Sequence, residues 1–275
     1  MSIILTNLKI GVQKPFRVLH MTDTHLTYAD MRDGERKVQL AQKRARSFRH
    51  AEEMLQLASE VSKRENLPIL HTGDLIDFVS LANLEAVERF IAQNDCFFAT
   101  GNHEFSLYVG EAKEDAAYRN QSLPAVQKVF KNDIRMASRV IGGVNFVALD
   151  DGYYLFEPQQ LAFLKSEVKR GLPVVLLLHN PLYEPKLHEY NIKQWDPCSY
   201  LVAVPEALMA GYSAHRFEQQ RADAMTLEAV EYIKNETQIK AIIAGHLHRD
   251  YEGVFGDRIP QIVTSCTKLR LIEFT

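Results

Sequence analysis

The chain has 275 residues, of which 46% are hydrophobic and 24% are charged, and its formal net charge is -3. This composition excludes a disordered chain, and the acidic balance argues against a surface devoted to nucleic acid or anionic membrane. Three scattered cysteines predict neither a disulfide framework nor a thiolate metal site. Without a signal-like or membrane-spanning apolar stretch, a linker or a repeat, we expect a cytoplasmic protein with one domain over residues 1–275.

Hydrophobic periodicity predicts strands that alternate with helices, which is typical of an α/β protein. Apolar residues at helical spacing mark the helices, and short apolar runs closed by turn residues mark the strands. In chain order, the predicted elements are a strand and turn at 2–12, a strand at 16–22, a helix at 47–64, a strand at 67–72, a helix at 81–92, a strand at 96–100, a helix fragment at 125–130, a strand at 145–149, a helix at 159–170, a strand at 173–178, a helix at 222–235, and strands at 239–244, 251–255, 261–266 and 269–274.

Three segments do not fit this alternation. Residues 26–46 are polar and cationic, and we interpret them as a solvated loop and helix that could also bring an arginine to an anionic substrate. Residues 105–124 form an irregular insertion, too long for a simple connection. Residues 184–221 carry the only tryptophan, Trp195, among prolines that break regular structure. This last segment is either a lid or specificity loop, or an excursion that only thickens the domain.

Five of the predicted strands end in polar side chains. Strand ends in an α/β fold converge on one rim, so these groups are expected to meet there. Taken singly, each group has an ordinary explanation, such as a chance Asp-x-His, a capped turn at Asn102 or a histidine satisfied by hydrogen bonds. The repetition favours a site. The groups are Asp23 and His25, Asp74, Asn102 and His103, His179, and His246 and His248.

This donor set is typical of a metal centre. Imidazole nitrogens and carboxylate oxygens without thiolates favour Mn²⁺, Fe²⁺/Fe³⁺ or Zn²⁺ over Ca²⁺. One ion needs fewer ligands than the strand ends supply. Two divalent metal ions about 3.5 to 4 Å apart, sharing a bridging carboxylate, would use them all, as in a two-metal hydrolase. Asp150 and Asp151 are left out of the set, because they precede Gly152 and a turn explains them.

In their order along the chain, these blocks resemble the signature of the calcineurin-like metallophosphoesterases. That signature reads Asp-x-His, Gly-Asp, Gly-Asn-His-Glu/Asp, His and Gly-His-x-His. It is present here as Asp23-Thr24-His25, Gly73-Asp74, Gly101-Asn102-His103-Glu104, His179 and Gly245-His246-Leu247-His248. The resemblance runs from about Val18 to His248, and it implies a sandwich of two mixed β-sheets flanked by helices, in four layers.

The resemblance also implies how the ligands are shared. Asp74 would bridge two metal ions, and a hydroxide between the ions would attack phosphorus in line. The implied ligands are Asp23, His25, Asp74 and His248 for one metal, and Asp74, Asn102, His179 and His246 for the other.

Two further residues have implied roles in catalysis. His103 resembles the family histidine that binds no metal and donates a proton to the leaving alkoxide. Asp77, three residues after Asp74, matches the aspartate that orients this histidine. An N-cap for the following helix explains Asp77 equally well, and both roles could hold.

Two departures from the family pattern narrow the range of possible substrates. The Ser/Thr protein phosphatases of this family carry arginines at the positions occupied here by Phe78 and Thr100, which argues against phosphoprotein substrates. Their absence is more compatible with the cyclic-nucleotide and glycerophosphodiester branch. We therefore expect a phosphodiesterase that acts on a small-molecule or nucleotide phosphoester, with some monoesterase activity.

Other functions on the same fold remain open at this point. A nuclease would need a basic track for the phosphate backbone, and residues 32–49 are the only candidate. A phosphomonoesterase of this family would carry the same signature blocks. A non-catalytic metal-binding scaffold, which some relatives are, would show a degraded site, whereas here every ligand and His103 are present. The oligomeric state cannot be inferred from the sequence.

Overall fold

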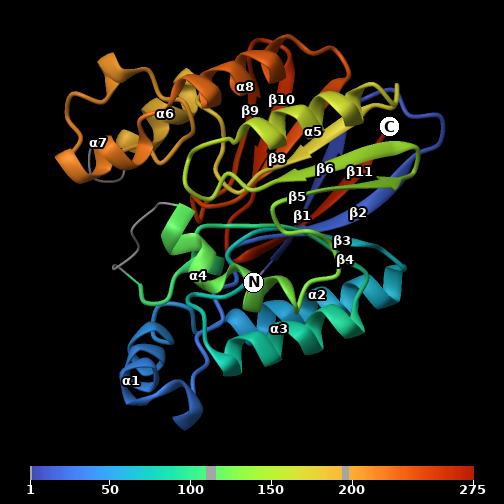
Figure 1. The fold of residues 1–275 in the computed structure, drawn as a ribbon. Helices are drawn as coiled ribbons and strands as arrows, with labels where there is room; N and C mark the ends of the chain where they lie inside the picture. Colours follow the sequence, from blue (N-terminus) through green and yellow to red (C-terminus); the bar gives the residue numbers. More distant parts are fainter. Residues whose placement is uncertain (1, 110–115, 194–197) are drawn as a thin grey trace.

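Two β-sheets pack face to face in the computed structural model, which describes residues 2–109, 116–193 and 198–275 (Figure 1). The first sheet has the strand order β1-β11-β2-β3-β4, and the second β5-β6-β7-β8-β10-β9. The strands of the first sheet are β1 (Ser2–Leu8), β11 (Lys268–Phe274), β2 (Phe16–Met21), β3 (Ile69–Thr72) and β4 (Cys96–Ala99). Those of the second are β5 (Met136–Ile141), β6 (Val144–Leu149), β7 (Val174–Leu177), β8 (Ile239–Ala244), β10 (Ile259–Val263) and β9 (Tyr251–Phe255).

Helices cover the outer faces of both sheets. In Figure 1, α2 and α3 lie along the first sheet, α5 and α8 lie along the second, and α1, α4, α6 and α7 gather at one end of the sandwich. The helices are α1 (Glu35–Arg44), α2 (Ala51–Glu65), α3 (Leu81–Gln93), α4 (Ala116–Gln127), α5 (Pro158–Val168), α6 (Pro185–Ile192), α7 (Ala214–Gln220) and α8 (Ala224–Asn235).

Three apolar clusters hold these layers together. Val18 and Phe146 belong to the cluster between the two sheets. Met54 of α2 packs in a second cluster under the first sheet, and Leu161 of α5 and Ile233 of α8 pack in a third over the second sheet. Burial of these faces is the main stabilising term. The order helix, sheet, sheet, helix confirms the expected fold class.

Parallel pairing fixes where the strand ends meet. Strands β2, β3 and β4 are parallel neighbours, and so are β6, β7 and β8. Their carboxyl ends therefore open on the same side of each sheet, as α/β sites require.

Within the described ranges, no helix is both long and apolar enough to cross a bilayer. The three cysteines are free.

The prediction of an irregular insertion over residues 105–124 is wrong from Ala116 onward. Helix α4 begins at Ala116 and runs through Pro124 to Gln127. A proline in a helix interior destabilises the helix by roughly 3 kcal/mol, and the predicted irregular segment therefore ends at Pro124. The helix persists because Ser122 and Val126 on its inner side are buried, Val126 in the cluster beneath the first sheet. Residues 110–115 of this insertion lie outside the described part of the chain.

The second insertion also contains regular structure. Pro185 begins helix α6 instead of breaking it, and the Glu184 side chain caps that helix by accepting from the backbone N–H of Lys186 and Leu187. Proline is favoured in this position because the first helical N–H has no partner in any case. Helix α7 follows later in the segment. Trp195 lies in residues 194–197, outside the described part.

Strand β5 was missed by the sequence analysis. It pairs antiparallel with β6 through a two-residue turn at Gly142 and Gly143. Both glycines have positive φ, 58° and 83°. A Gly-Gly pair between two apolar runs is a hairpin signal, so the information was present in the sequence.

Candidate metal centre

The strand-end residues predicted as ligands lie together at the rim between the two sheets, and five of them have unusual backbone conformations. These five have φ between 51° and 68°, in the left-handed region. Such conformations cost side chains other than glycine of order 1–3 kcal/mol each and concentrate at functional sites. They are Asp23, His25, Asp74, His246 and His248.

One cluster joins the end of β2 to the loop after β8. Nε2 of His25 lies 3.0 Å from Nε2 of His248. Oδ1 of Asp23 lies 3.4 Å from the same His248 nitrogen and 3.9 Å from the His25 nitrogen. These three ligand atoms can therefore face one ion.

A second cluster joins the ends of β4, β7 and β8. Nε2 of His179 lies 3.1 Å from Oδ1 of Asn102 and 3.1 Å from Nδ1 of His246. The opposite nitrogen of His179 is fixed by the backbone carbonyl of Thr72 at 2.7 Å. Since that carbonyl can only accept, Nδ1 carries a hydrogen, and Nε2 is the nitrogen that faces Asn102 and His246.

Asp74 lies between the two clusters. Its Oδ2 is 3.6 Å from Nε2 of His25 and 3.2 Å from Nε2 of His179. A Cβ at Gly101 would come within 2.2 Å of the other oxygen, Oδ1, so the loop after β4 can approach this carboxylate only as glycine. Asp74 is thus placed to contact both clusters.

The donor atoms fit divalent metal ions. Two pairs of imidazole nitrogens approach to 3.0 and 3.1 Å, each beside a buried carboxylate. Lone pairs aimed at one point need a proton or a cation between them. Nitrogen and oxygen donors without sulfur match the intermediate metals named above. Asp23, His25, Asp74 and His179 are also buried, so water cannot neutralise them.

The charges of the cluster depend on one another. Burial alone would raise the pKa of Asp74, but the neighbouring His179 and His103 lower it well below its usual range. Burial lowers the pKa of His179, and the carboxylates of Asp74 and Asp23 more than offset this and raise it to about 10. The pKa of His246 is well below its usual value because of burial and the adjacent His179.

His103 lies beside this cluster, and its ring is held by Asp77. Its Nδ1 lies 2.6 Å from the backbone carbonyl of Asp77 and 3.4 Å from the carboxylate oxygen Oδ1. The same Oδ1 lies 3.1 Å from Nδ1 of His25. The N-cap alternative for Asp77 is wrong, since the cap of α3 is Ser80, whose side chain accepts from the N–H of Asn83.

Glu104 has a structural role that the sequence analysis did not assign. Its carboxylate is fully buried and accepts hydrogen bonds from the backbone N–H groups of Asp74 and Gly101, both at 2.8 Å, and of Leu75 at 2.7 Å. Burial and the nearby Asp74 raise the pKa of Glu104 to about 7. It ties the loop after β3 to the loop after β4.

The Asp150-Asp151-Gly152 segment turns as expected, but its carboxylates are buried. The N–H of Gly152 donates to Oδ1 of Asp150, 3.1 Å away, as in an Asx turn. Asp151 accepts from the backbone N–H of His179 at 2.8 Å and so holds the end of β7. Burial raises the pKa of Asp151 to about 7. Turn statistics gave no sign of this contact.

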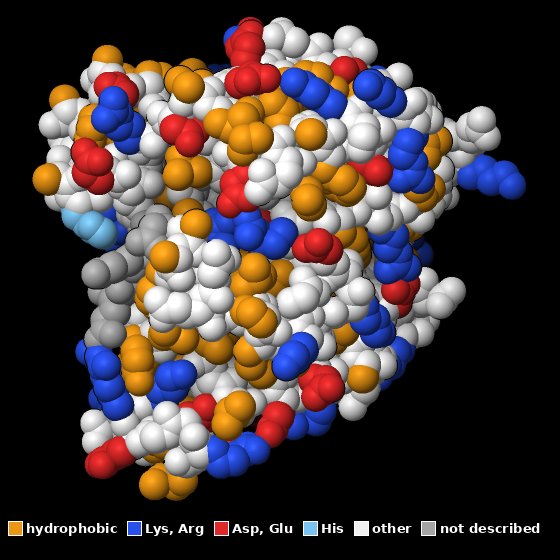
Figure 2. All heavy atoms as spheres, in the orientation of Figure 1, with side chains coloured by type: hydrophobic (Ala, Val, Ile, Leu, Met, Phe, Trp, Pro, Cys, Tyr) orange, Lys and Arg blue, Asp and Glu red, His pale blue; other side chains and the backbone are white. Residues whose placement is uncertain are grey.

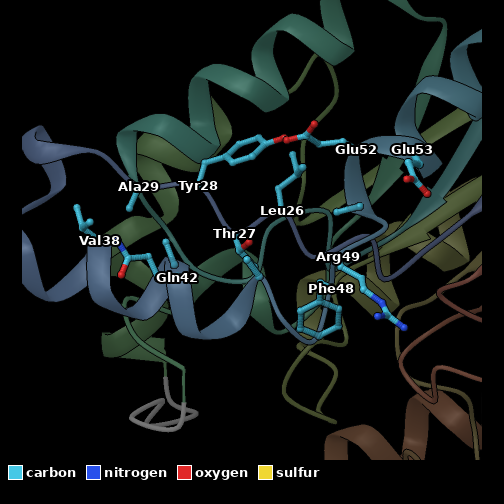
Figure 3. A pocket seen from close by; sticks show the side chains of 13 residues that line it. Leu26, Thr27, Tyr28, Ala29, Val38, Gln42, Phe48, Arg49, Glu52 and Glu53 are labelled. Atoms are coloured by element: carbon cyan, nitrogen blue, oxygen red, sulfur yellow. The ribbon is translucent and has the colours of Figure 1, made fainter.

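A cavity of about 510 Å³ lies between α1 and α2, next to the centre. In Figure 3 the side chains of Tyr28 and Glu52 meet on one side of the cavity and Phe48 lies on the opposite side. The ring of Phe48 stacks on His25 with centroids 4.1 Å apart. One aromatic ring is therefore the wall between the cavity and a predicted ligand.

The sequence matches a known protein family. The family model described as calcineurin-like phosphoesterase matches residues 16–250. No curated protein matches the chain. A dimetal phosphatase from Danio rerio is similar in structure, with a TM-score of 0.51 and 15% identity over 91% of this chain and 87% of that chain.

Other solved structures are more distantly similar. The phosphopantetheinyl hydrolase of Mycobacterium tuberculosis has a TM-score of 0.43 and 10% identity, over 90% of this chain and 89% of its own. A 5'-nucleotidase from Candida albicans has a TM-score of 0.42 and 13% identity, over 91% of this chain but only 45% of its own.

Proposed function

The chain belongs to the calcineurin-like phosphoesterase family and is a phosphoester hydrolase, and from that premise we propose that it is a phosphodiesterase that uses two divalent metal ions. The substrate is a small-molecule or nucleotide diester. The placement of Asp74 carries the two-metal part of the proposal: its Oδ2 lies 3.6 Å from Nε2 of His25 and 3.2 Å from Nε2 of His179, and these two histidines belong to different ligand clusters.

The ligand sets proposed from the resemblance are compatible with the distances. Mn²⁺, Fe²⁺/Fe³⁺ or Zn²⁺ are the metals that these donors favour. When bound, such ions offset charge on the phosphoryl oxygens and lower the pKa of a water molecule. Asp23, His25, Asp74 and His248 would hold one ion, and Asp74, Asn102, His179 and His246 the other.

His103 is the proposed proton donor to the leaving alkoxide. The carbonyl of Asp77 can only accept, so Nδ1 of His103 carries a hydrogen and Nε2 is the nitrogen that exchanges a proton with a substrate oxygen. The ring is only partly buried, with 18% of its side chain exposed, which leaves it reachable from solvent.

Two positions that hold arginines in the Ser/Thr protein phosphatases of this family hold Phe78 and Thr100 here, which supports a diester over a monoester. Phe78 is fully buried, and the hydroxyl of Thr100 donates to the carbonyl of Ile134. Neither position offers a cation to the extra negative charge of a monoester. A diester carries one charge less and depends less on such groups.

The test compares two chromogenic esters on the metal-loaded protein. We expect kcat/KM for bis-p-nitrophenyl phosphate to exceed that for p-nitrophenyl phosphate. A large preference for the monoester would replace this proposal with a phosphomonoesterase. That outcome would not bear on the proposed role of Asp74 as a bridge between two metal ions.

A nuclease and a non-catalytic scaffold are less well supported. Figure 2 shows lysines and arginines interspersed with acidic and uncharged side chains over the face drawn, without a continuous basic track. A steep salt dependence of binding to single-stranded DNA would favour the nuclease. A scaffold would bind metal without hydrolysing any ester.

A further inference from the structure

We propose that Arg44, the last residue of α1, is a positioning residue of the metal centre that acts through Asp77 on His25. The proposal rests on the proposed function, because it takes His25 as a metal ligand. Arg44 lies outside all the signature blocks, in the segment of residues 26–46 that we interpret from the sequence as a solvated loop and helix.

The guanidinium of Arg44 binds the Asp77 carboxylate through two parallel hydrogen bonds. Nε donates to Oδ2 at 2.7 Å, and Nη2 donates to Oδ1 at 2.8 Å. This fork geometry fixes the plane of a carboxylate as well as its place. The Asp77 side chain is fully buried, so Arg44 decides the orientation of a group that water cannot reach.

Asp77 passes this orientation on to His25. Its Oδ1 lies 3.1 Å from Nδ1 of His25, while Nε2 of the same ring faces the first ligand cluster, 3.0 Å from His248. A carboxylate on one ring nitrogen keeps the hydrogen on that side and leaves the other nitrogen as a lone-pair donor. Arg44, Asp77 and His25 thus form a chain of contacts that ends at the ligand atom.

The same segment holds the face of the imidazole. Phe48, four residues after Arg44, stacks on His25 with an interplanar angle of 16°, and Cζ of Arg44 lies 5.1 Å from the centre of the Phe48 ring. His25 is therefore held at its edge by Asp77 and at its face by Phe48. Phe48 belongs to the connection between α1 and α2, and Asp77 is held by Arg44 at the start of that connection.

Arg44 differs from the cations on either side of it. Lys43 and Arg46 are exposed, and among the described residues neither has an ion-pair partner. Ala41 is the only buried residue of α1, so the helix has little apolar surface to hold it against the rest of the protein. The Arg44 ion pair reaches into the centre, whereas its neighbours only add charge to the surface.

The experiment compares Arg44→Gln with Lys43→Gln and Arg46→Gln, which remove the same charge nearby. Mn²⁺ binding to each full-length protein is measured by calorimetric titration after chelation. We expect Arg44→Gln to weaken one of the two sites by about 10–100-fold, the effect typical of a lost partner behind a metal-binding histidine. The site served by His179 should keep its affinity, and both control variants should match the wild type.

Arg44→Lys supplies a second variant that keeps the charge but not the fork, and it should also weaken one site. If Arg44→Gln does not fold, the Mn²⁺ affinities of Arg44→Lys test the proposal instead. The proposal would be overturned if both Arg44 variants bound two Mn²⁺ ions with the wild-type affinities. It would also be overturned if both sites were weakened equally. Failure of the wild-type protein to bind Mn²⁺ would instead overturn the ligand assignment of the proposed function, and this inference with it.

Discussion

The phenol hydroxyl of Tyr154 lies 2.7 Å from Nε2 of His246, and the other nitrogen of that ring lies 3.1 Å from His179. Tyr154 is buried, and its own backbone is in the left-handed region at φ 62°. A residue held in this way at the back of an imidazole fixes the orientation of the ring. Tyr154 thus supports His246 as Asp77 supports His25.

Tyr154→Phe is expected to weaken binding of one metal ion by about 10–100-fold, because the His246 ring loses the hydrogen-bond partner that orients it. Calorimetric titration with Mn²⁺ measures the effect. The matched control is Tyr153→Phe, since the Tyr153 ring packs against Arg119 with 4.5 Å between Cζ and the ring centre. Equal affinities in the two variants would show that the Tyr154 hydroxyl has no role at the centre.

His103→Ala should lower kcat for bis-p-nitrophenyl phosphate by about 10²–10⁴-fold, the usual contribution of a general acid. The metal content of the purified protein should stay at the wild-type value, because the proposed ligands are other residues. Elemental analysis of the same preparation provides the control. Loss of metal together with activity would make His103 a ligand, and unchanged kcat would remove it from the mechanism.

Glu104→Gln is expected to reduce the free energy of unfolding by about 2–4 kcal/mol. A glutamine NH₂ group cannot accept, so it leaves buried backbone N–H groups without a partner at about 1–3 kcal/mol each. The N–H groups at risk include those of Asp74 and Gly101. Urea unfolding measures the change, and Glu88→Gln on the exposed side of α3 is the control. A stability within 0.5 kcal/mol, on the order of a neutral surface change, would contradict the account of Glu104.

Metal binding should release protons and strengthen as the pH rises. The pKa of His179 is raised to about 10, so its imidazole is protonated at neutral pH before metal enters. A metal ion that takes Nε2 must displace that proton, and affinity should rise about tenfold per pH unit below this pKa for each proton released. Titrations with Mn²⁺ between about pH 6.5 and 8.5 test this. An affinity independent of pH would show that His179 is neutral or not a ligand.

The strand ends were predictable because the signal lies within each strand. Val174–Leu177 is a short apolar run, and a polar residue that follows such a run must lie at the rim of the sheet. The same logic located Asp74 and His246. Ordered blocks with these residue types then predicted the fold class, which the structure confirms.

The supporting residues could not be found in this way, because their roles depend on contacts between distant segments. Tyr154 and His246 are 92 positions apart, and Arg44 and Asp77 are 33 apart. Nothing in the local pattern of a tyrosine or an arginine indicates such a partner. Pro124 and Pro185 were misread for a related reason, since local preference marks proline as a breaker and only packing and capping show that a helix includes it.

The most direct test of the two-metal assignment is metal content by elemental analysis, combined with hydrolysis of bis-p-nitrophenyl phosphate after loading with Mn²⁺. The account predicts close to two metal ions per chain and diester cleavage that chelation abolishes. A chain that takes up no metal after loading would contradict the assignment of Asp74 as a bridge between two ions.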